Sequence, residues 1–343
     1  MVLIGCFLST LTVSAQDIHF SHIHASPLYL NPSFTGLIND GAARLIVNSK
    51  SQWNSVTNAY STAAASADIK LMARKGTLIS GGIQVFADKA GDLSLTTVKT
   101  ALSASIIKSL DFDDNYLLNF GVNAGHVSNR IDYSQMIGFD DEPLIAQGIE
   151  SKINYWDFGV GLSWFAKLSE YSQVYVGGSF WHFNTPDVSF SQNIREGSDD
   201  ETKLQRERLY AKKVIHGGGS FKIAQRVWLE PSFIFMDQGP HQEINTGTFV
   251  KYLKSKKRHK KYSFYVGVWI RWYLENDVNG VDAAVAAVRM DYNNTYLTLS
   301  YDINLSTYQR ASNGAGGVEL SLIHILAMDR YSRSLSPICC PKI

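Results

Sequence analysis

The sequence predicts an all-β protein, an antiparallel transmembrane β-barrel of about 14 strands that follows an N-terminal signal peptide. Three observations support this prediction. One stretch of the chain has the side-chain alternation of a membrane strand. The same alternation returns in block after block. The two longest connections between the blocks lie on the same side of the predicted barrel, although the short connection 89–92 also falls there.

The stretch 261–275, KYSFYVGVWIRWYLE, shows the alternation most clearly. Successive side chains of a strand point to opposite faces. One face is an unbroken apolar row with aromatic residues at both ends: Tyr262, Phe264, Val266, Val268, Ile270 and Trp272. The other face is small, polar or hydrogen-bonding: Ser263, Tyr265, Gly267, Trp269, Arg271 and Tyr273. Lipid would solvate the first row, and its terminal rings would lie at the two membrane interfaces.

The alternation recurs from Ala42 onward. In one block Leu118, Phe120 and Val122 oppose Asn119 and Gly121. Carboxylates such as Asp157, Asp302 and Glu319 fall on the inward faces, where a wet lumen tolerates them. The predicted strands are 42–49, 59–71, 77–88, 93–108, 115–128, 153–166, 171–184, 209–223, 225–237, 243–254, 261–275, 281–291, 294–305 and 315–327.

The connections test the barrel independently. With a periplasmic N-terminus, the first, third and later odd-numbered connections become the outer loops. The two longest connections, 129–152 and 185–208, both fall in that set. A soluble protein made of hairpins has no reason to sort loop lengths in this way.

Composition and motifs exclude several function classes. Charged residues are 18% of the 343-residue chain and the formal net charge is +1, which argues against nucleic acid as a partner. No phosphate-binding loop, dinucleotide fingerprint, serine elbow or zinc motif is present. His216 precedes three glycines, as in an oxyanion loop, but no serine elbow accompanies it. We therefore expect no catalytic residue, cofactor or small-molecule substrate.

The barrel is flanked by terminal segments. Residues 1–15 are expected to be a signal peptide, although no Lys or Arg precedes its apolar run. Lipidation at Cys6 and a buried N-terminal element are the alternatives. Residues 16–41 are expected to form a periplasmic lead-in, 42–327 the barrel, and 328–343 a periplasmic tail. The tail carries the adjacent Cys339 and Cys340, which could bridge only with strain.

The lead-in contains His19, His22 and His24. Histidine is a common metal ligand, but no cysteine or carboxylate cluster accompanies these three. A surface or plug-like segment is the favoured interpretation over a metal site. Pro27 and Pro32 should interrupt regular structure.

Partner-binding candidates come from the charged segments and one aromatic residue. The loop 185–208 and the turn 254–261 are both strongly charged, and each is either a solvated surface or a docking surface. Trp53, in the first outer loop, is either a partner anchor or a residue of the interfacial girdle. The candidate residues are Trp53, Arg195, Arg206, Arg208, Lys256, Lys257 and Arg258.

Short motifs give the chain a family resemblance. FSHIHASPLYLNPSFTG, within residues 17–36, resembles the opening of the PorP/SprF family of type IX secretion outer-membrane proteins. Further similarities are Ser51-Gln52-Trp53 to an RxQW-type segment, Ser300-Tyr301-Asp302-Ile303 to a YSYDI-type strand, 317–322 to a GxxELSL strand, and 340–343 to a CPRF-type end. The matches keep their order along the whole predicted mature chain.

The resemblance implies an outer-membrane component that supports export or surface attachment of a large adhesin, often in gliding bacteria. It implies other type IX components and outer-membrane lipid as partners, and it carries over no catalytic residue. The alternative function is a porin-like channel for small solutes. Such a channel needs an open lumen, whereas Trp228, Trp269 and Tyr296 are predicted to face inward.

Overall fold

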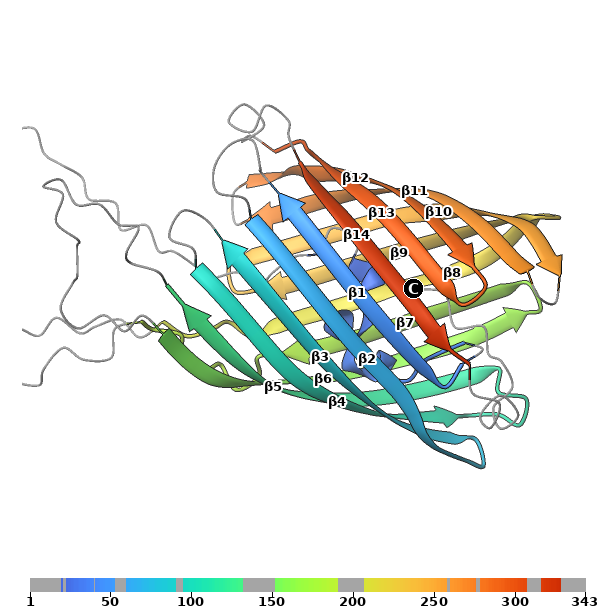
Figure 1. Cartoon of the computed structure of the whole chain (residues 1–343), viewed down its shortest axis with the longest axis horizontal. Helices are drawn as coiled ribbons and strands as arrows, with labels where there is room; N and C mark the ends of the chain where they lie inside the picture. The colour runs from blue at the N-terminus through green and yellow to red at the C-terminus, as the bar shows by residue number, and fades with distance from the viewer. Residues whose placement is uncertain are drawn as a thin grey trace, which may run out of the picture.

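Fourteen antiparallel strands pair in sequence order, and the last pairs with the first, so the sheet closes into a barrel (Figure 1). The structure is a computed structural model that describes residues 20, 23–39, 41–52, 60–90, 95–131, 152–190, 207–257, 260–275, 278–306 and 316–327. The strands are β1 Ala43–Gln52, β2 Tyr60–Arg74, β3 Thr77–Ala90, β4 Leu95–Ser109, β5 Tyr116–Arg130, β6 Lys152–Ser169, β7 Ser172–Trp181, β8 Lys212–Ala224, β9 Val227–Gln238, β10 His241–Lys257, β11 Lys260–Glu275, β12 Val278–Tyr292, β13 Thr295–Asn304 and β14 Gly317–Leu326.

The predicted strands are confirmed in number and order, and their ends differ by a few residues. No end differs by more than three residues, and one example is β7, which was predicted to run to residue 184 but ends at Trp181. The next residue, His182, has a φ of 54°, which an L-residue in a strand does not adopt. No helix in the described part of the chain is long and apolar enough to cross a membrane.

The two faces of the wall differ as the alternation predicts. On β11, Phe264, Val266 and Val268 are exposed on the outside, whereas Tyr265 and Trp269 are buried inside. The polar side chains Asp157, Asp302 and Glu319 are also buried inside the barrel. The apolar outer face suits lipid contact and the inner face suits polar contacts.

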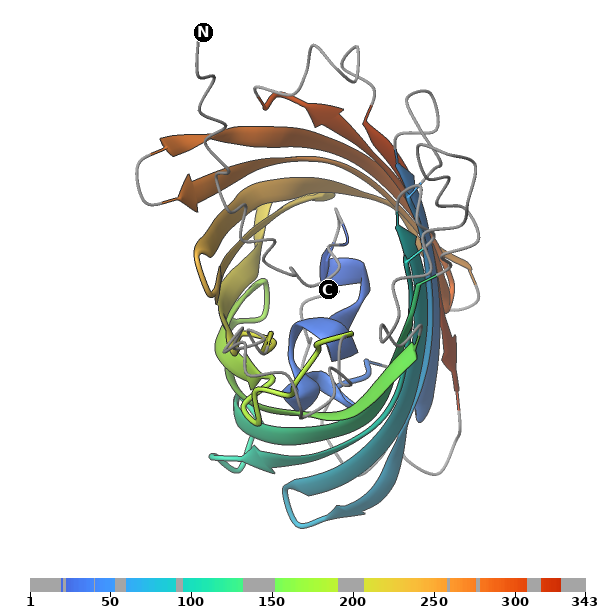
Figure 2. The same ribbon diagram turned by 90° about the vertical axis from the view of Figure 1, so that its left-hand side faces the viewer.

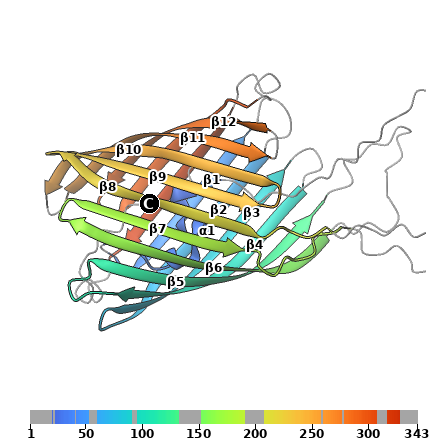
Figure 3. The same ribbon diagram turned by 180° about the vertical axis from the view of Figure 1, so that it is seen from behind.

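The barrel has two different ends. We call the end that holds the connections 131–151 and 182–211 the loop end. The opposite end, which we call the turn end, holds the connections 75–76, 110–115, 170–171, 225–226, 258–259 and 293–294. Figure 3 shows the wall from behind, with the tilted strands joined alternately at the two ends. The sorting of connection lengths predicted from the sequence is thus present.

The lead-in segment lies inside the barrel. It forms three short helical turns, η1 Ile23–Ala25, α1 Pro27–Leu30 and η2 Pro32–Phe34. Pro27 and Pro32 each occupy the start of a turn, where a missing N–H costs nothing. Figure 2 shows these turns within the ring of strands. We call residues 23–39 the plug. The plug-like interpretation of the lead-in segment fits this position.

Candidate functional site: a plugged lumen with two different ends

Asn31 is the central polar anchor of the plug and is fully buried. Its side-chain amide nitrogen donates to the carbonyl oxygens of Leu162 at 3.1 Å and Gly178 at 2.9 Å. The same nitrogen lies 2.9 Å from His216 Nε2. Its side-chain oxygen accepts a hydrogen bond from the Ser33 N–H, which caps η2. One side chain thus starts a helical turn and fastens it to β6, β7 and β8.

Two glycines on neighbouring strands make room for this anchor. Gly121 on β5 and Gly161 on β6 pair directly across the sheet. A Cβ atom at Gly161 would lie 1.9 Å from Asn31 Oδ1, and one at Gly121 would lie 2.3 Å from the Pro32 carbonyl. No side chain larger than hydrogen fits at either position while the plug is in place.

A buried ion pair holds the other end of the plug. Arg44 on β1 donates two hydrogen bonds to the Asp68 carboxylate on β2, at 3.0 and 2.8 Å. Arg44 also donates to the Phe34 carbonyl at 3.1 Å, and Asp68 accepts from the Gly36 N–H at 2.7 Å. Both charged side chains are less than a tenth exposed. Each charge has its partner, and the plug backbone supplies one further hydrogen bond to each side chain, so these contacts offset the cost of burial.

Small hydroxyl side chains complete the anchorage. Ser33 Oγ lies 2.8 Å from Ser163 Oγ, and Thr35 donates to Ser103 Oγ at 3.0 Å. Ser179 on β7 donates to the Leu30 carbonyl at 2.7 Å. Serine side chains are short, so the wall approaches the plug backbone closely and still satisfies its carbonyl groups.

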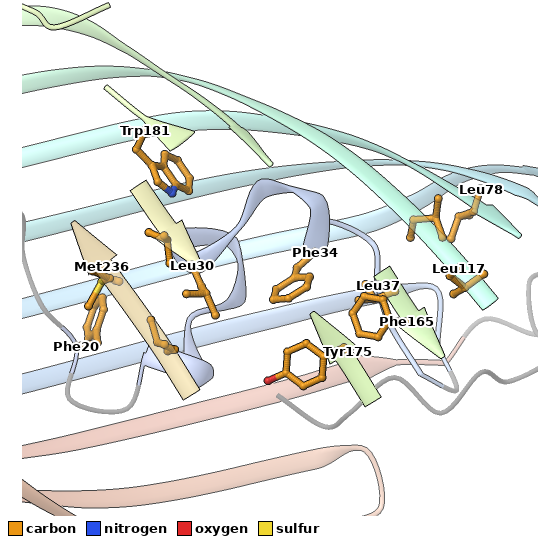
Figure 4. Packing of buried hydrophobic residues seen from close by; sticks show 14 residues of the cluster. Phe20, Leu30, Phe34, Leu37, Leu78, Leu117, Phe165, Tyr175, Trp181 and Met236 are labelled. Carbon is orange, nitrogen blue, oxygen red and sulfur yellow. The ribbon is translucent and has the colours of Figure 1, made fainter. Parts of the chain in front are cut away.

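An apolar cluster surrounds the same anchors (Figure 4). The Phe34 ring lies 5.9 Å from the Phe165 ring and 6.4 Å from the Tyr175 ring, between centroids. Phe20 and Leu30 extend the cluster toward Trp181 and Met236 near the loop end. The plug therefore has a hydrophobic core of its own against the wall, in addition to its hydrogen bonds.

The strands β9 to β14 fill most of their part of the lumen with their own side chains, and Ile38 of the plug packs with Tyr296 and Ile323 at its edge. The Trp269 ring packs edge-to-face against the Phe249 ring, with 4.6 Å between the ring centroids. Its indole N–H donates a hydrogen bond to Ser232 Oγ at 3.1 Å. The guanidinium of Arg289 lies 4.9 Å from the Tyr265 ring centroid and 4.8 Å from that of Tyr296. The predicted inward direction of Trp269 and Tyr296 is confirmed by their burial.

Nearer the loop end, the inner face of the same strands carries a cluster of charged side chains. Arg271 donates to Asp282 at 2.6 Å and to Asp302 at 3.4 Å. Lys50 lies 3.9 Å from the same Asp302 carboxylate. A separate buried cluster on the plug side joins Lys99, Asp157 and His182, with 2.6 Å between His182 Nδ1 and Asp157 Oδ1. These ionic side chains crosslink the wall from inside, between adjacent strands and between strands that one other strand separates.

A match to a family model decides the family. The model for the type IX secretion system membrane protein PorP/SprF matches residues 12–323, which is nearly the whole chain. This chain belongs to the PorP/SprF family. The resemblance predicted from the short motifs is confirmed.

Solved structures of low identity share the barrel fold. A FadL homologue from Pseudomonas aeruginosa is 9% identical with a TM-score of 0.52, and the alignment covers 88% of this chain and 94% of that one. The toluene transporter TbuX from Ralstonia pickettii is 11% identical with a TM-score of 0.49, covering 87% and 92%. The first likeness supports the fold alone. No curated protein matches the sequence. Family and fold together make this chain an outer-membrane β-barrel of a secretion system.

Of the predicted partner-binding residues of this PorP/SprF protein, the three that the structure describes lie at opposite ends of the barrel. Arg208 is exposed at the loop end, where it pairs with Asp187 in an isolated β-bridge. Lys256 and Lys257 end β10 at the turn end, on the opposite side of the barrel. Trp53, Arg195, Arg206 and Arg258 lie outside the described residues.

The described ends of the longest connection, 182–211, pack against the loop end of the barrel. Val188 and Leu209 are buried against Ile153 of β6, and the Val188 N–H donates to the Glu207 carbonyl at 2.8 Å. The two described ends of connection 182–211 therefore contact each other beside Arg208. These contacts hold the start and the end of the connection in place on the loop end.

Of the three lead-in histidines, only His24 lies among the described residues. It is buried, and burial lowers the pKa of its imidazole to about 4, so the ring is neutral at neutral pH. The described residues contain no group of three or more metal-ligating side chains. His19 and His22 lie outside the described residues.

Sequence reasoning missed the residues that hold the plug, namely Arg44, Asp68, Asn31, Gly121 and Gly161. One signal was available. The two glycines fall at paired positions on the inward faces of adjacent predicted strands. Such a pair indicates that another segment of the chain packs closely against the wall there. The segment that packs against these glycines could not be identified from the sequence, because Asn31 and Pro32 are more than 80 residues away from both of them.

Proposed function

We propose that this barrel supports export or cell-surface attachment of a large adhesin by the type IX secretion machinery, as a non-catalytic scaffold. The observation that carries the proposal is the plug. It is fixed to β1, β2, β4, β6, β7 and β8 by buried hydrogen bonds, and the opposite arc fills its own part of the lumen. A lumen filled in this way suits a barrel that works through its ends.

In this proposal the loop end faces outward and binds the secreted partner, and the turn end faces the periplasm with the C-terminal segment. The long connections and the exposed Arg208 would contribute to the outer docking surface. The charged hairpin around Lys256 and Lys257 would contribute to contacts with other type IX components on the periplasmic side. Residues 1–15 would be removed on export.

The first experiment is a pull-down of the tagged protein from detergent-solubilised outer membranes of the native cell, followed by mass spectrometry. We expect a large surface adhesin or type IX components to co-elute, and Arg208→Glu to reduce recovery of the outer partner. Lys213→Glu is a matched control, because Lys213 is also exposed near the loop end and, within the described part of the chain, its ion pair is with Asp237. Deleting the gene should remove adhesin from the cell surface without impairing solute uptake.

Conductance in planar bilayers tests the channel alternative. The native protein should conduct weakly, and a variant without the plug, residues 23–39, should conduct more. High conductance of the native protein, together with a pull-down free of partners, would favour the solute channel over the scaffold.

A further inference from the structure

One connection at the turn end is built differently from the others. Five of the six connections there have two residues between strands, whereas the β4–β5 connection spans residues 110–115. Two residues are enough to reverse an antiparallel chain. The additional length of this connection is therefore not needed to close the barrel.

The longer turn presents an aromatic side chain to solvent. Phe112 is 107% exposed, and the next most exposed large hydrophobic residue among those described is Val266 on the lipid-facing wall, at 65%. Leu110, in the same turn, is 55% exposed. A fully exposed phenylalanine in a turn contributes nothing to the core, and exposed aromatic residues of this kind are typical anchors of protein interfaces.

The turn is rigid rather than loosely extended. The Asp111 carboxylate accepts a hydrogen bond from the Tyr116 N–H at 3.0 Å and another from the Asn115 side chain at 3.0 Å. Ser109 donates to the Asp111 carbonyl at 2.8 Å, and the Lys167 N–H donates to the Asn115 carbonyl at 2.8 Å. These bonds fix the two ends of the turn, so fewer backbone conformations remain for Phe112 to lose on binding.

The charge around Phe112 indicates the kind of partner. Asp111, Asp113 and Asp114 flank it within three residues. Anionic lipid headgroups would repel three carboxylates, so insertion into a membrane surface is disfavoured. An apolar pocket rimmed by Lys or Arg side chains fits both the ring and its charges.

We propose that the turn 110–115 is a docking element for a protein on the turn-end side of the membrane. Phe112 enters an apolar pocket of that protein, and Asp113 meets basic side chains at the rim of the pocket. The proposal does not depend on the identity of the secreted partner, so it can fail while the proposed function stands, and the reverse also holds.

The test places a photo-crosslinking phenylalanine analogue at position 112 in the full-length protein in its native cells. We expect a covalent adduct with one protein, and we expect the crosslinked peptide of that protein to border Lys or Arg residues. Adding Asp113→Lys should lower the adduct yield about tenfold, because a rim charge then repels its partner. Glu170→Lys is the matched control, since Glu170 is an exposed acid in the β6–β7 turn at the same end.

The same crosslinker at Phe120, which is 48% exposed on the wall, should give lipid adducts only. Lipid adducts at position 112, no adduct there, or a protein adduct that Asp113→Lys leaves unchanged would each overturn the proposal. Heat-dependent migration on gels should be unchanged in every variant, since neither Phe112 nor Asp113 takes part in the hydrogen bonds that hold the turn.

Discussion

The arc β1–β8 and the arc β9–β14 fill the same lumen by different means. On the first arc, several wall positions that face the plug carry only glycine or serine, as at Gly121, Gly161 and Ser163, and a separate segment supplies much of the bulk. On the second arc, the wall supplies the bulk itself through Tyr265, Trp269 and Arg289. In the first arc the lumen is filled by a separate segment, the plug, which could leave without unfolding the wall. In the second arc the lumen is filled by side chains of the strands themselves.

The two arcs also use charge differently. The Arg44–Asp68 pair binds the plug backbone as well as each other, so it couples the segment to the wall. The Arg271 contacts run between strands of the barrel and reach no part of the plug through the bonds described. Substitutions in the first arc should therefore release the plug, and those in the second should loosen the wall.

The largest effect is expected from Asp68→Ala. This change leaves the Arg44 guanidinium buried without its carboxylate and removes the acceptor of the Gly36 N–H. We expect the free energy of unfolding to fall by about 3–5 kcal/mol. Urea titration in detergent, followed by tryptophan fluorescence, measures this loss.

Limited proteolysis of the same variant should cut within residues 23–39 before it cuts the barrel. Asp237→Ala is the control, because its partner Lys213 is exposed and the pair should contribute at most about 1 kcal/mol. Equal losses in the two variants would contradict the role given to the buried pair.

Arg271→Ala tests the charge of the second arc. Its loss should cost about 1.5–3 kcal/mol, less than Asp68→Ala, because Lys50 still faces Asp302 and the Asp282 side chain is 37% exposed. Protease sensitivity of the plug should remain as in the native protein. A plug that becomes cleavable in this variant would show that the arcs are not independent.

Gly161→Ala tests the space that the wall leaves for the plug. The added methyl group would collide with Asn31, and such overpacking typically costs about 1–3 kcal/mol. Gly81→Ala is the control, since the nearest atom to a Cβ there is a terminal carbon of the flexible Leu71 side chain at 3.2 Å. Unfolding midpoints of the two variants, measured side by side, should differ clearly.

The wall was predictable from sequence and the plug was not, for a physical reason. Alternation with period two is a local property, so rows such as Tyr262 to Trp272 reveal their faces within one strand. The position of the plug depends on contacts such as Asn31 with His216, which are 185 residues apart. No local pattern distinguishes a segment that lies inside a barrel from one that lies below it. The strand ends were also uncertain, as at His182, where a backbone conformation ends β7.

The smallest effect is expected from Trp269→Phe in the second arc. The change keeps an aromatic ring beside Phe249 but removes the N–H that Ser232 accepts, so it should cost about 0.5–1.5 kcal/mol. Ser232→Ala should cost a similar amount, and the double variant should cost little more than either, since both remove the same hydrogen bond. Additive losses would mean that Trp269 stabilises the wall by filling volume and that its hydrogen bond contributes little. In that case the second arc would tolerate any large apolar side chain at position 269, whereas the first arc would still accept only glycine where Asn31 approaches.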